Sequence, residues 1–279
     1  LERAGARVLY SYPGIKVHTK LLLISREEDG EERRYAYIGT GNFNEKTARI
    51  YCDHALLTAD ARLADEVERV FRLLERQIII PRCRHLLVAP FTLRDRFEAL
   101  IDREIAAAEA GKPAYMILKM NSLEDPAMVE KLYQASRAGV RTRLIVRGIC
   151  CLVPGLPGKS ENIEIISIVD RFLEHARLYL FANGGDEVLY LASADWMTRN
   201  LDHRVEVAAP IYDAAVFREL RAFLELQLHD NQKARYIVAE QSNPYRQAAP
   251  GAPPRRAQYD AYRYLQEKEN KHKKSEHSI

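Results

Sequence analysis

Two histidines, His18 and His175, each precede a cationic residue by two positions. Lys20 and an apolar stretch follow His18, and Arg177 and a second apolar stretch follow His175. Because alternate side chains of a strand point to the same face, each histidine should share a face with its cation. A neutral imidazole can attack phosphorus, and a cation beside it can neutralise phosphate oxygens. The pattern therefore predicts phosphoryl transfer, whereas a single histidine in a strand would more often be structural.

The surroundings of the two histidines form an internal repeat. Each histidine is followed by a strand, a turn and a second strand, and then by a tetrapeptide of small and polar residues. These tetrapeptides are Gly-Thr-Gly-Asn at residues 39–42 and Ala-Ser-Ala-Asp at residues 192–195. The first copy is four residues longer than the second, which a longer hairpin explains, with its tip expected at residues 28–31. Such repetition indicates two related lobes that meet at one site, each supplying one histidine.

The first tetrapeptide opens a glycine-containing loop at residues 39–44. Glycines let backbone N–H groups come close to an anion. The amides of Asn42 and Asn44 could then orient an imidazole or hold phosphate oxygens.

Four longer stretches carry a family resemblance, at residues 38–48, 144–150, 167–175 and 193–200. They are similar to the carboxy-terminal catalytic half of the bacterial polyphosphate kinase family, the histidine-phosphorylated type. That family resembles the phospholipase D superfamily in its paired histidine motifs. The resemblance runs from about residue 1 to about residue 245.

The resemblance implies an α/β fold with two phospholipase D-like lobes, in which mixed sheets are flanked by helices. We expect residues 1–84 to form the carboxy-terminal part of the first lobe, which would lack its amino end. Residues 85–243 would form the second lobe. Residues 244–279 would form a proline-rich linker and a charged tail, so the chain reads as a carboxy-terminal fragment.

The resemblance also implies an activity, which is the reversible transfer of the ATP γ-phosphate to the end of a polyphosphate chain through a phosphohistidine. His18 would be phosphorylated and Lys20 would neutralise phosphate oxygens. His175 would act either as a general acid/base or as a nucleotide ligand. The residues expected to bind ATP are Tyr51, Arg147, His175, Asn42, Asn44 and Arg177.

The resemblance further implies partners and a cofactor. ATP or ADP and polyphosphate are the expected partners, in a homo-oligomer that is a dimer or a tetramer. Mg²⁺ is expected with ATP, but its ligands would precede Leu1, so no metal-binding residue is assigned here.

Composition excludes some functions. The formal charge of +3 is too small to imply nucleic-acid binding. The four cysteines lack the spacing of a metal site, and no signal peptide or membrane-length apolar run is present. These features favour a reducing cytoplasm, and the family adds the periphery of the inner membrane as an alternative.

Two rival interpretations remain open at this point. One is a phospholipase D-like phosphodiesterase, but the aspartate that such motifs carry five residues after the cation is Ser25 in one copy and Ala182 in the other. The second is a catalytically incomplete fragment of the kinase. Within the kinase pattern, a position that is often histidine is Tyr37 here, so no role can be assigned to a histidine at that position.

The periodicity of apolar residues predicts the elements that position these side chains. We expect strands at residues 7–12, 15–24, 34–38, 114–120, 143–146, 163–168 and 204–208. We expect helices at residues 62–76 and 214–228, one that Thr92 and Asp95 open as a capping box, and one that Asp125 caps. Residues 258–279 should form a frayed helix or a disordered tail.

Overall fold

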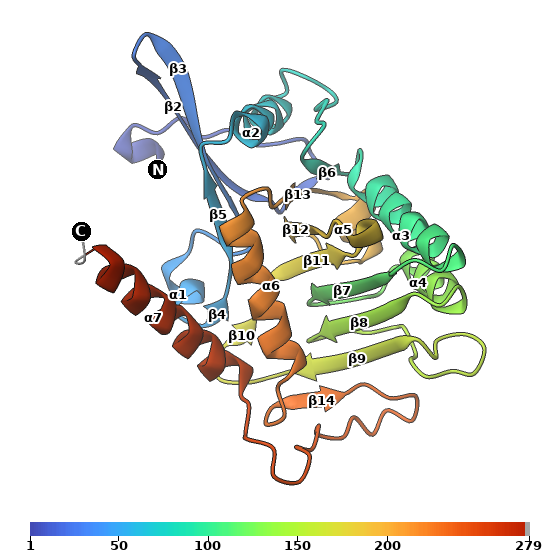
Figure 1. Ribbon diagram of the computed structural model, residues 1–279. Helices are drawn as coiled ribbons and strands as arrows, with labels where there is room; N and C mark the ends of the chain where they lie inside the picture. Colours follow the sequence, from blue (N-terminus) through green and yellow to red (C-terminus); the bar gives the residue numbers. More distant parts are fainter. Residues whose placement is uncertain (277–279) are drawn as a thin grey trace.

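The computed structural model describes residues 1–276 of the chain (Figure 1). We call residues 1–84 the first half and residues 85–276 the second half. The longer helices are α2 (Ala61–Leu74), α3 (Leu93–Glu109), α4 (Pro126–Arg137), α6 (Ala214–Leu228) and α7 (Ala257–Glu276), and the shorter ones are η1 (Glu2–Ala4), α1 (Glu45–Ala48), η2 (Asn183–Gly185) and α5 (Thr198–Asp202).

A nine-stranded mixed sheet dominates the second half. Its order is β1-β13-β12-β11-β7-β8-β9-β14, and β6 also pairs with β13. The strands are β1 (Lys16–Val17), β6 (Leu87–Ala89), β7 (Tyr115–Met120), β8 (Arg141–Val146), β9 (Ile163–Ile168), β11 (Arg177–Phe181), β12 (Val188–Ala192), β13 (Arg204–Pro210) and β14 (Ala234–Tyr236). As the β-α-β pattern predicted, β7 and β8 are parallel and α4 connects them.

Helices cover both faces of this sheet. Phe97 of α3 and Leu132 of α4 pack on one face, in a core that includes the stacked rings of Tyr179 and Trp196. Leu224 of α6 packs on the other face, where α7 also lies (Figure 1). Because both faces are covered, the central strands are mostly apolar, and the charged residues Lys119 of β7 and Arg177 of β11 are themselves buried.

The first half carries a smaller sheet of three antiparallel strands, β2 (Lys20–Glu28), β3 (Glu31–Gly39) and β5 (Ala55–Thr58). Helix α2 packs on it through its apolar stripe, with Leu63, Val67 and Val70 buried. The predicted hairpin tip lies between β2 and β3, where Asp29 and Gly30 both have positive φ.

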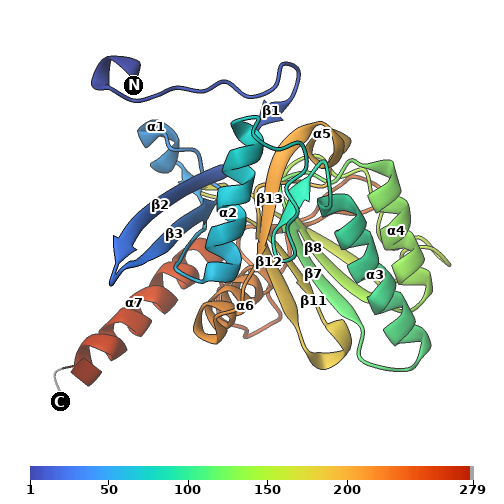
Figure 2. The same ribbon diagram turned by 90° about the horizontal axis from the view of Figure 1, so that it is seen from above.

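Each half contributes a two-residue strand to the other. β1 precedes His18 in the first half but pairs in parallel with β13 (Figure 2). In the second half, β10 (Leu173–Glu174) precedes His175 and pairs in parallel with β4 (Tyr51–Cys52) of the first. This exchange brings both histidines to the junction of the two halves.

Most of the expected helices are confirmed. Helix α6 has the predicted bounds, and Asp125 caps α4 by accepting a hydrogen bond from the Met128 N–H at 3.0 Å. Arg94 of α3 donates to both Asp125 and Asp202, so one guanidinium ties together α3, α4 and α5.

Three local expectations were wrong. The strand predicted at residues 15–24 is interrupted at residues 18–19, which separate β1 from β2, because the N–H groups of both residues donate to the Val205 carbonyl. Residues 7–12 form no strand, because they find no partner edge, and Leu9 and Tyr10 are exposed. Thr92 precedes α3 but does not form a capping box, since its hydroxyl accepts from the Val88 N–H at 3.0 Å.

The carboxy-terminal segment is more ordered than its composition suggested. The Arg246 N–H donates to the Ala234 carbonyl at 2.9 Å, and the Asn231 N–H donates to the Arg255 carbonyl at 3.0 Å, so the proline-rich stretch follows the edge of the second half. Helix α7 then packs on α6 and continues to Glu276. Residues 277–279 of the expected tail lie outside the described residues. None of the helices in residues 1–276 combines the length and apolarity needed to cross a membrane.

Candidate active site

His18 lies between β1 and β2 and is held by the second half. The backbone N–H groups of His18 and Thr19 both donate to the Val205 carbonyl at 3.0 Å, which forms a small bulge in the chain. The ring atom Nδ1 lies 2.8 Å from one oxygen of the Glu206 carboxylate and 2.9 Å from the other. Glu206 is fully buried and therefore fixes the orientation of the imidazole.

His175 has the same arrangement with the halves exchanged. The N–H groups of His175 and Ala176 both donate to the Cys52 carbonyl at 3.1 Å. Its ring Nδ1 lies 2.6 Å from the carboxylate of Asp53 in the first half. Each half therefore supplies the carboxylate that orients the histidine of the other half.

Each of these carboxylates is held by the hydroxyl of a repeated tetrapeptide. Thr40 donates to Asp53 at 2.8 Å, and Ser193 donates to Glu206. In both copies the acidic residue follows the hydroxyl residue by thirteen positions. No role was predicted for Asp53 or Glu206 from the sequence, although this equal spacing was a signal that could have found them.

The carboxylates decide which ring nitrogen of each histidine is reactive. Since Nδ1–H donates to the carboxylate, Nε2 keeps its lone pair and can act as nucleophile or base. The side chains of His18 and His175 are 20% and 12% exposed. Both rings are thus oriented and partly accessible, with His18 the more open.

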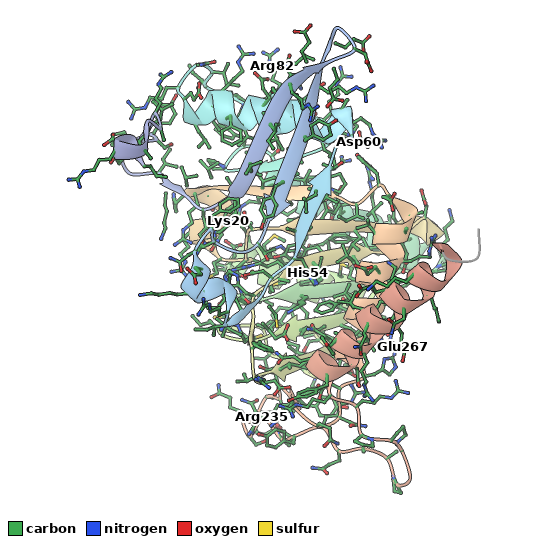
Figure 3. All side chains as sticks on the ribbon, turned by 90° about the vertical axis from the view of Figure 1, so that its left-hand side faces the viewer. Lys20, His54, Asp60, Arg82, Arg235 and Glu267 are labelled. Carbon is green, nitrogen blue, oxygen red and sulfur yellow. The ribbon has the colours of Figure 1, made fainter. Side chains whose placement is uncertain are left out.

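The two cations sit at equivalent places but have different partners. The Lys20 ammonium donates to the His18 carbonyl, and the Arg177 guanidinium donates to the His175 carbonyl. Arg177 is also paired with buried Asp195, its Nη2 lying 3.1 Å from a carboxylate oxygen. Among the described residues Lys20 forms no ion pair. Figure 3 shows Lys20 at the root of the β2–β3 hairpin, where the first half meets the second.

The pKa of Lys20 is lowered to about 8, mainly by burial, with Glu206 opposing the shift and the positive charge of Arg177 adding to it. Lys20 is only 5% exposed. Burial disfavours the charged form of Lys20. A phosphate bound beside the ammonium would stabilise that charged form, because its negative charge would add to that of Glu206 and offset the cost of desolvation.

Arg147 and Tyr51 complete the group around His175. Arg147 Nε donates to the Glu174 carbonyl at 2.7 Å, and the Tyr51 ring lies 4.7 Å from the His175 ring between centroids. Burial lowers the pKa of Arg147, and the nearby charge of Arg177 lowers it further. Burial likewise lowers the pKa of His175, against the opposing effect of Asp53. A neutral His175 with cations beside it favours the binding of an anion.

The asparagines of the glycine loop do not orient either imidazole. The side-chain oxygen of Asn44 caps α1 by accepting from the Lys46 and Thr47 N–H groups at 3.0 and 3.1 Å. Asn42 is exposed. The expectation that these amides orient a histidine was wrong, because Asp53 and Glu206 do so.

The glycine loop instead makes room for the protein's own carboxylate. A Cβ atom on Gly41 would lie 2.6 Å from Cγ of Asp53, closer than carbon atoms can approach. Glycine is therefore needed at this position for Asp53 to reach His175.

The carboxylates of this site do not form a metal site. Asp53 and Glu206 each bind a histidine, and Asp195 binds Arg177. In residues 1–276 no group of three or more His, Cys, Asp or Glu side chains is arranged to hold a metal ion.

Comparisons with known proteins agree with this geometry. The family described as "Polyphosphate kinase C-terminal domain 1" matches residues 1–79, and "Polyphosphate kinase C-terminal domain 2" matches residues 86–258. The chain belongs to the polyphosphate kinase family. The Escherichia coli K12 polyphosphate kinase is 52% identical over 245 residues, which are 88% of this chain and 36% of that protein. The Yersinia pestis polyphosphate kinase is 53% identical over the same share of each chain.

A solved member of the polyphosphate kinase family has the same fold. The crystal structure of polyphosphate kinase from Porphyromonas gingivalis matches with a TM-score of 0.92 and 46% identity, over 97% of this chain and 42% of that chain. The predicted α/β class, with mixed sheets flanked by helices, is confirmed. The chain spans about a third of the length of the curated relatives it matches.

Proposed function

We propose that this chain carries the phosphoryl-transfer site of a polyphosphate kinase, which moves the ATP γ-phosphate reversibly to the end of a polyphosphate chain. The observation that supports it best is the pair of histidines whose Nδ1 atoms are held by carboxylates, each with a buried cation two residues later. This arrangement frees both Nε2 atoms for chemistry at phosphorus.

In the first step, Nε2 of His18 attacks the γ-phosphorus of ATP. The nitrogen–phosphorus bond forms as the bond to the bridging oxygen breaks, and ADP leaves with that oxygen. The imidazole of the intermediate is cationic, and the Glu206 carboxylate on Nδ1 stabilises that charge. Lys20 neutralises the oxygens of the moving group, since phosphoryl transfer depends mainly on positioning and charge compensation.

In the second step, a terminal oxygen of polyphosphate attacks the phosphorus of the phosphohistidine. The nitrogen–phosphorus bond breaks, the chain becomes one phosphate longer, and His18 returns to its neutral form. The reverse sequence makes ATP from ADP and polyphosphate.

His18 is the better nucleophile of the two histidines. Its side chain is more exposed than that of His175, and Lys20 has no carboxylate partner among the described residues to compete with a phosphate. His175 packs against Tyr51 and lies close enough to Arg177 and Lys20 for their charges to lower its pKa, and Arg147 donates to the carbonyl of Glu174, directly before it. That setting suits a ligand for the nucleotide phosphates or a general acid/base.

The other proposed nucleotide ligands differ in how free their groups are. Arg147 donates its Nε–H to the Glu174 carbonyl, and the N–H groups of its two terminal nitrogens could still bind a phosphate. Arg177 is committed to Asp195 and contributes charge rather than a direct contact. Asn42 and Asn44 could offer only amide groups at the rim of the site, because the Asn44 oxygen is already used.

Mg²⁺ is expected with ATP in this family. The residues described here do not fit a direct magnesium site, since their carboxylates are engaged with histidine or arginine.

The remaining proposals concern assembly and location. We propose that the chain divides into residues 1–84, 85–243 and 244–279. We further propose that it forms a homo-oligomer, and that it is located in the cytoplasm or at the periphery of the inner membrane. Four free cysteines support a reducing compartment.

The test is labelling with γ-labelled ATP followed by assay for alkali-stable, acid-labile label. It uses this chain and a chimera, in which the part of the Escherichia coli polyphosphate kinase that precedes the matched region is joined in front of it. Each is compared with its His18→Ala variant. Label that disappears in His18→Ala would support the proposal.

Other outcomes separate the alternatives. Label that survives in His18→Ala would move the nucleophile, with His175 the first residue to test. Label on the chimera alone would mean that this chain holds the nucleophile without a complete site. Absence of label on both, with turnover of a phosphodiester, would overturn the kinase in favour of a phosphodiesterase.

A further inference from the structure

The two histidine motifs differ in the residue that comes directly before the histidine. In the first half this residue is Val17, which is 36% exposed. In the second half it is Glu174, which is 2% exposed. Only the second copy of the repeat therefore places a buried charged residue directly before its histidine.

Glu174 links several elements to the site. Its Oε2 accepts from Lys119 of β7 at 2.9 Å and from Gln227 of α6 at 2.7 Å. Its backbone carbonyl accepts from Arg147 at 2.7 Å. Burial alone would raise the pKa of this carboxyl, but the charge of Lys119 and the surrounding hydrogen bonds outweigh it and lower the pKa. Glu174 is thus a buried anion that directly precedes His175 and whose carbonyl binds Arg147.

The second oxygen of Glu174 is held by the carboxy-terminal helix. Gln258, in the first turn of α7, donates from Nε2 to Glu174 Oε1 at 2.8 Å. The same amide donates to the Phe172 carbonyl at 2.8 Å and accepts from the Phe172 N–H at 3.0 Å. One side chain therefore satisfies both backbone groups of Phe172 and one oxygen of Glu174.

Arg256 adds an ion pair to the same segment. Its guanidinium binds Asp170, with Nε at 2.8 Å from one carboxylate oxygen. The first turn of α7 is fixed in turn by Asp230, which accepts from the Ala257 N–H at 2.7 Å. The segment that leads directly to His175 is thus held at Asp170 by Arg256, which precedes α7, and at Phe172 and Glu174 by Gln258 in its first turn.

We propose that Gln258 and Arg256, which we call the carboxy-terminal latch, are positioning residues for His175 and Arg147. The latch holds Glu174 and the backbone of Phe172, and these set the place of the His175 ring and of the Arg147 guanidinium. The proposal rests on the proposed function only in taking these two residues as nucleotide ligands. It gives a role to the difference between the repeats, because His175 and Arg147 are the proposed nucleotide ligands, whereas His18 is the proposed nucleophile.

The buried charge of Glu174 makes its position depend on Gln258. Without Gln258, one oxygen of Glu174 would lose its donor while remaining buried, and such a group is costly. Turning Glu174 toward solvent would relieve that cost, and it would move the Glu174 carbonyl away from Arg147. The effect should therefore appear at Arg147 and His175 and be absent at His18.

The experiment compares Gln258→Met with Gln266→Met in this chain. Gln266 lies on the same helix and is exposed, and in residues 1–276 its side chain makes no hydrogen bond, so it is a matched control. Methionine keeps the length of glutamine without its amide. The histidine rings are followed by NMR with isotope-labelled histidine, and the His175 signal is assigned by its loss in His175→Asn. Calorimetry with ATP gives the affinity.

We expect Gln258→Met to shift the His175 ring signals and their titration, to leave those of His18 unchanged, and to weaken ATP binding about tenfold. Gln266→Met should match the parent chain. In the chimera, KM for ATP should rise more than kcat falls, whereas a general loss of stability would lower the amount of active protein. If Gln258→Met does not fold, Gln258→Asn, which is one methylene shorter, gives the same comparison.

Unchanged His175 signals in a folded Gln258 variant would overturn the latch. Equal shifts at His18 and His175 would also overturn it, because they would indicate a general rather than a local effect. Failure of the proposed function is a separate result: the parent chain and chimera would then take no label at His18, while the NMR comparison would still decide whether the latch positions His175.

Discussion

Nδ1 of His175 lies 2.6 Å from the carboxylate of Asp53, although 122 residues separate them along the chain. The equivalent pair in the other motif is His18 and Glu206, which are 188 positions apart in the sequence. Each histidine thus depends on the opposite half of the molecule for its orientation. A site built in this way is complete only when both halves are in register.

The first prediction concerns the carboxylate behind the proposed nucleophile. Glu206→Gln keeps the shape of the side chain but removes the charge that stabilises a phosphorylated His18. We expect the rate of label incorporation into the chimera to fall on the order of ten- to a hundredfold, as for other groups that orient a reactive histidine. Thermal unfolding followed by circular dichroism serves as the control for folding. A variant that folds and labels at the parent rate would contradict the assigned role.

The second prediction is a pH dependence set by Lys20. Because burial lowers its pKa to about 8, the ammonium loses its charge as pH rises through that value. We expect kcat/KM for ATP in the chimera to decline above about pH 8, since this ratio reports groups of the free enzyme. Lys20→Arg should keep the rate high at more alkaline pH, because a guanidinium stays charged. Lys112→Arg, at an exposed position, should leave the profile unaltered; an identical decline in Lys20→Arg would exclude Lys20 as its source.

The third prediction tests the close approach of Gly41 to Asp53. Gly41→Ala places a methyl group against the Asp53 carboxylate, and we expect a loss of about 1–3 kcal/mol in the free energy of unfolding, as for other overpacked sites. Urea unfolding measures it. If the clash is the cause, the double variant with Asp53→Ala should lose less than the sum of the two single losses. Additive losses would mean that the alanine acts elsewhere.

The fourth prediction is an acid dependence of stability that does not involve the proposed reaction. Burial alone would raise the pKa of Asp125, but Arg94, the Met128 N–H and Thr198 outweigh it and lower the pKa to about 2. A carboxyl whose folded pKa is depressed stabilises the fold above its unfolded pKa, and this contribution is lost as pH falls from about 4 to about 2.

The matched comparison for this effect is Asp125→Asn against Asp29→Asn at the exposed hairpin tip. Asp125→Asn should lower the free energy of unfolding at neutral pH by about 1–3 kcal/mol and flatten its dependence on pH below 4. Asp29→Asn should change neither quantity. Equal slopes for the parent and Asp125→Asn between pH 4 and 2 would show that another group causes the acid dependence.

The sequence predicted elements well where the signal was local. Helix α6 and the β2–β3 hairpin tip were placed correctly, because apolar periodicity and turn residues are encoded within a few positions. Residues 7–12 show why such patterns are insufficient: a strand-like stretch forms no strand unless another edge pairs with it. Thr92 shows the same limit for a cap, since its hydroxyl found a nearer backbone partner at Val88.

The sequence predicted the two histidines of the site but not the residues that orient them. The repeated spacing located His18 and His175 directly. Asp53 and Glu206 were not predicted, although each follows its hydroxyl residue by thirteen positions, because the exchange of strands that brings them to the opposite histidines is not visible in the sequence. Gln258 was less predictable still, because a charged, lysine-rich tail gave no indication that its first turn enters a buried hydrogen-bond network.

The exchange of β1 and β10 has a practical consequence. If the chain were cut between Cys83 and His85 and the pieces were expressed separately, each would carry a histidine without its orienting carboxylate. Neither fragment could regain a correctly oriented ring by refolding alone. If labelling returned when the two pieces were mixed, it would show that they had reassembled into one site.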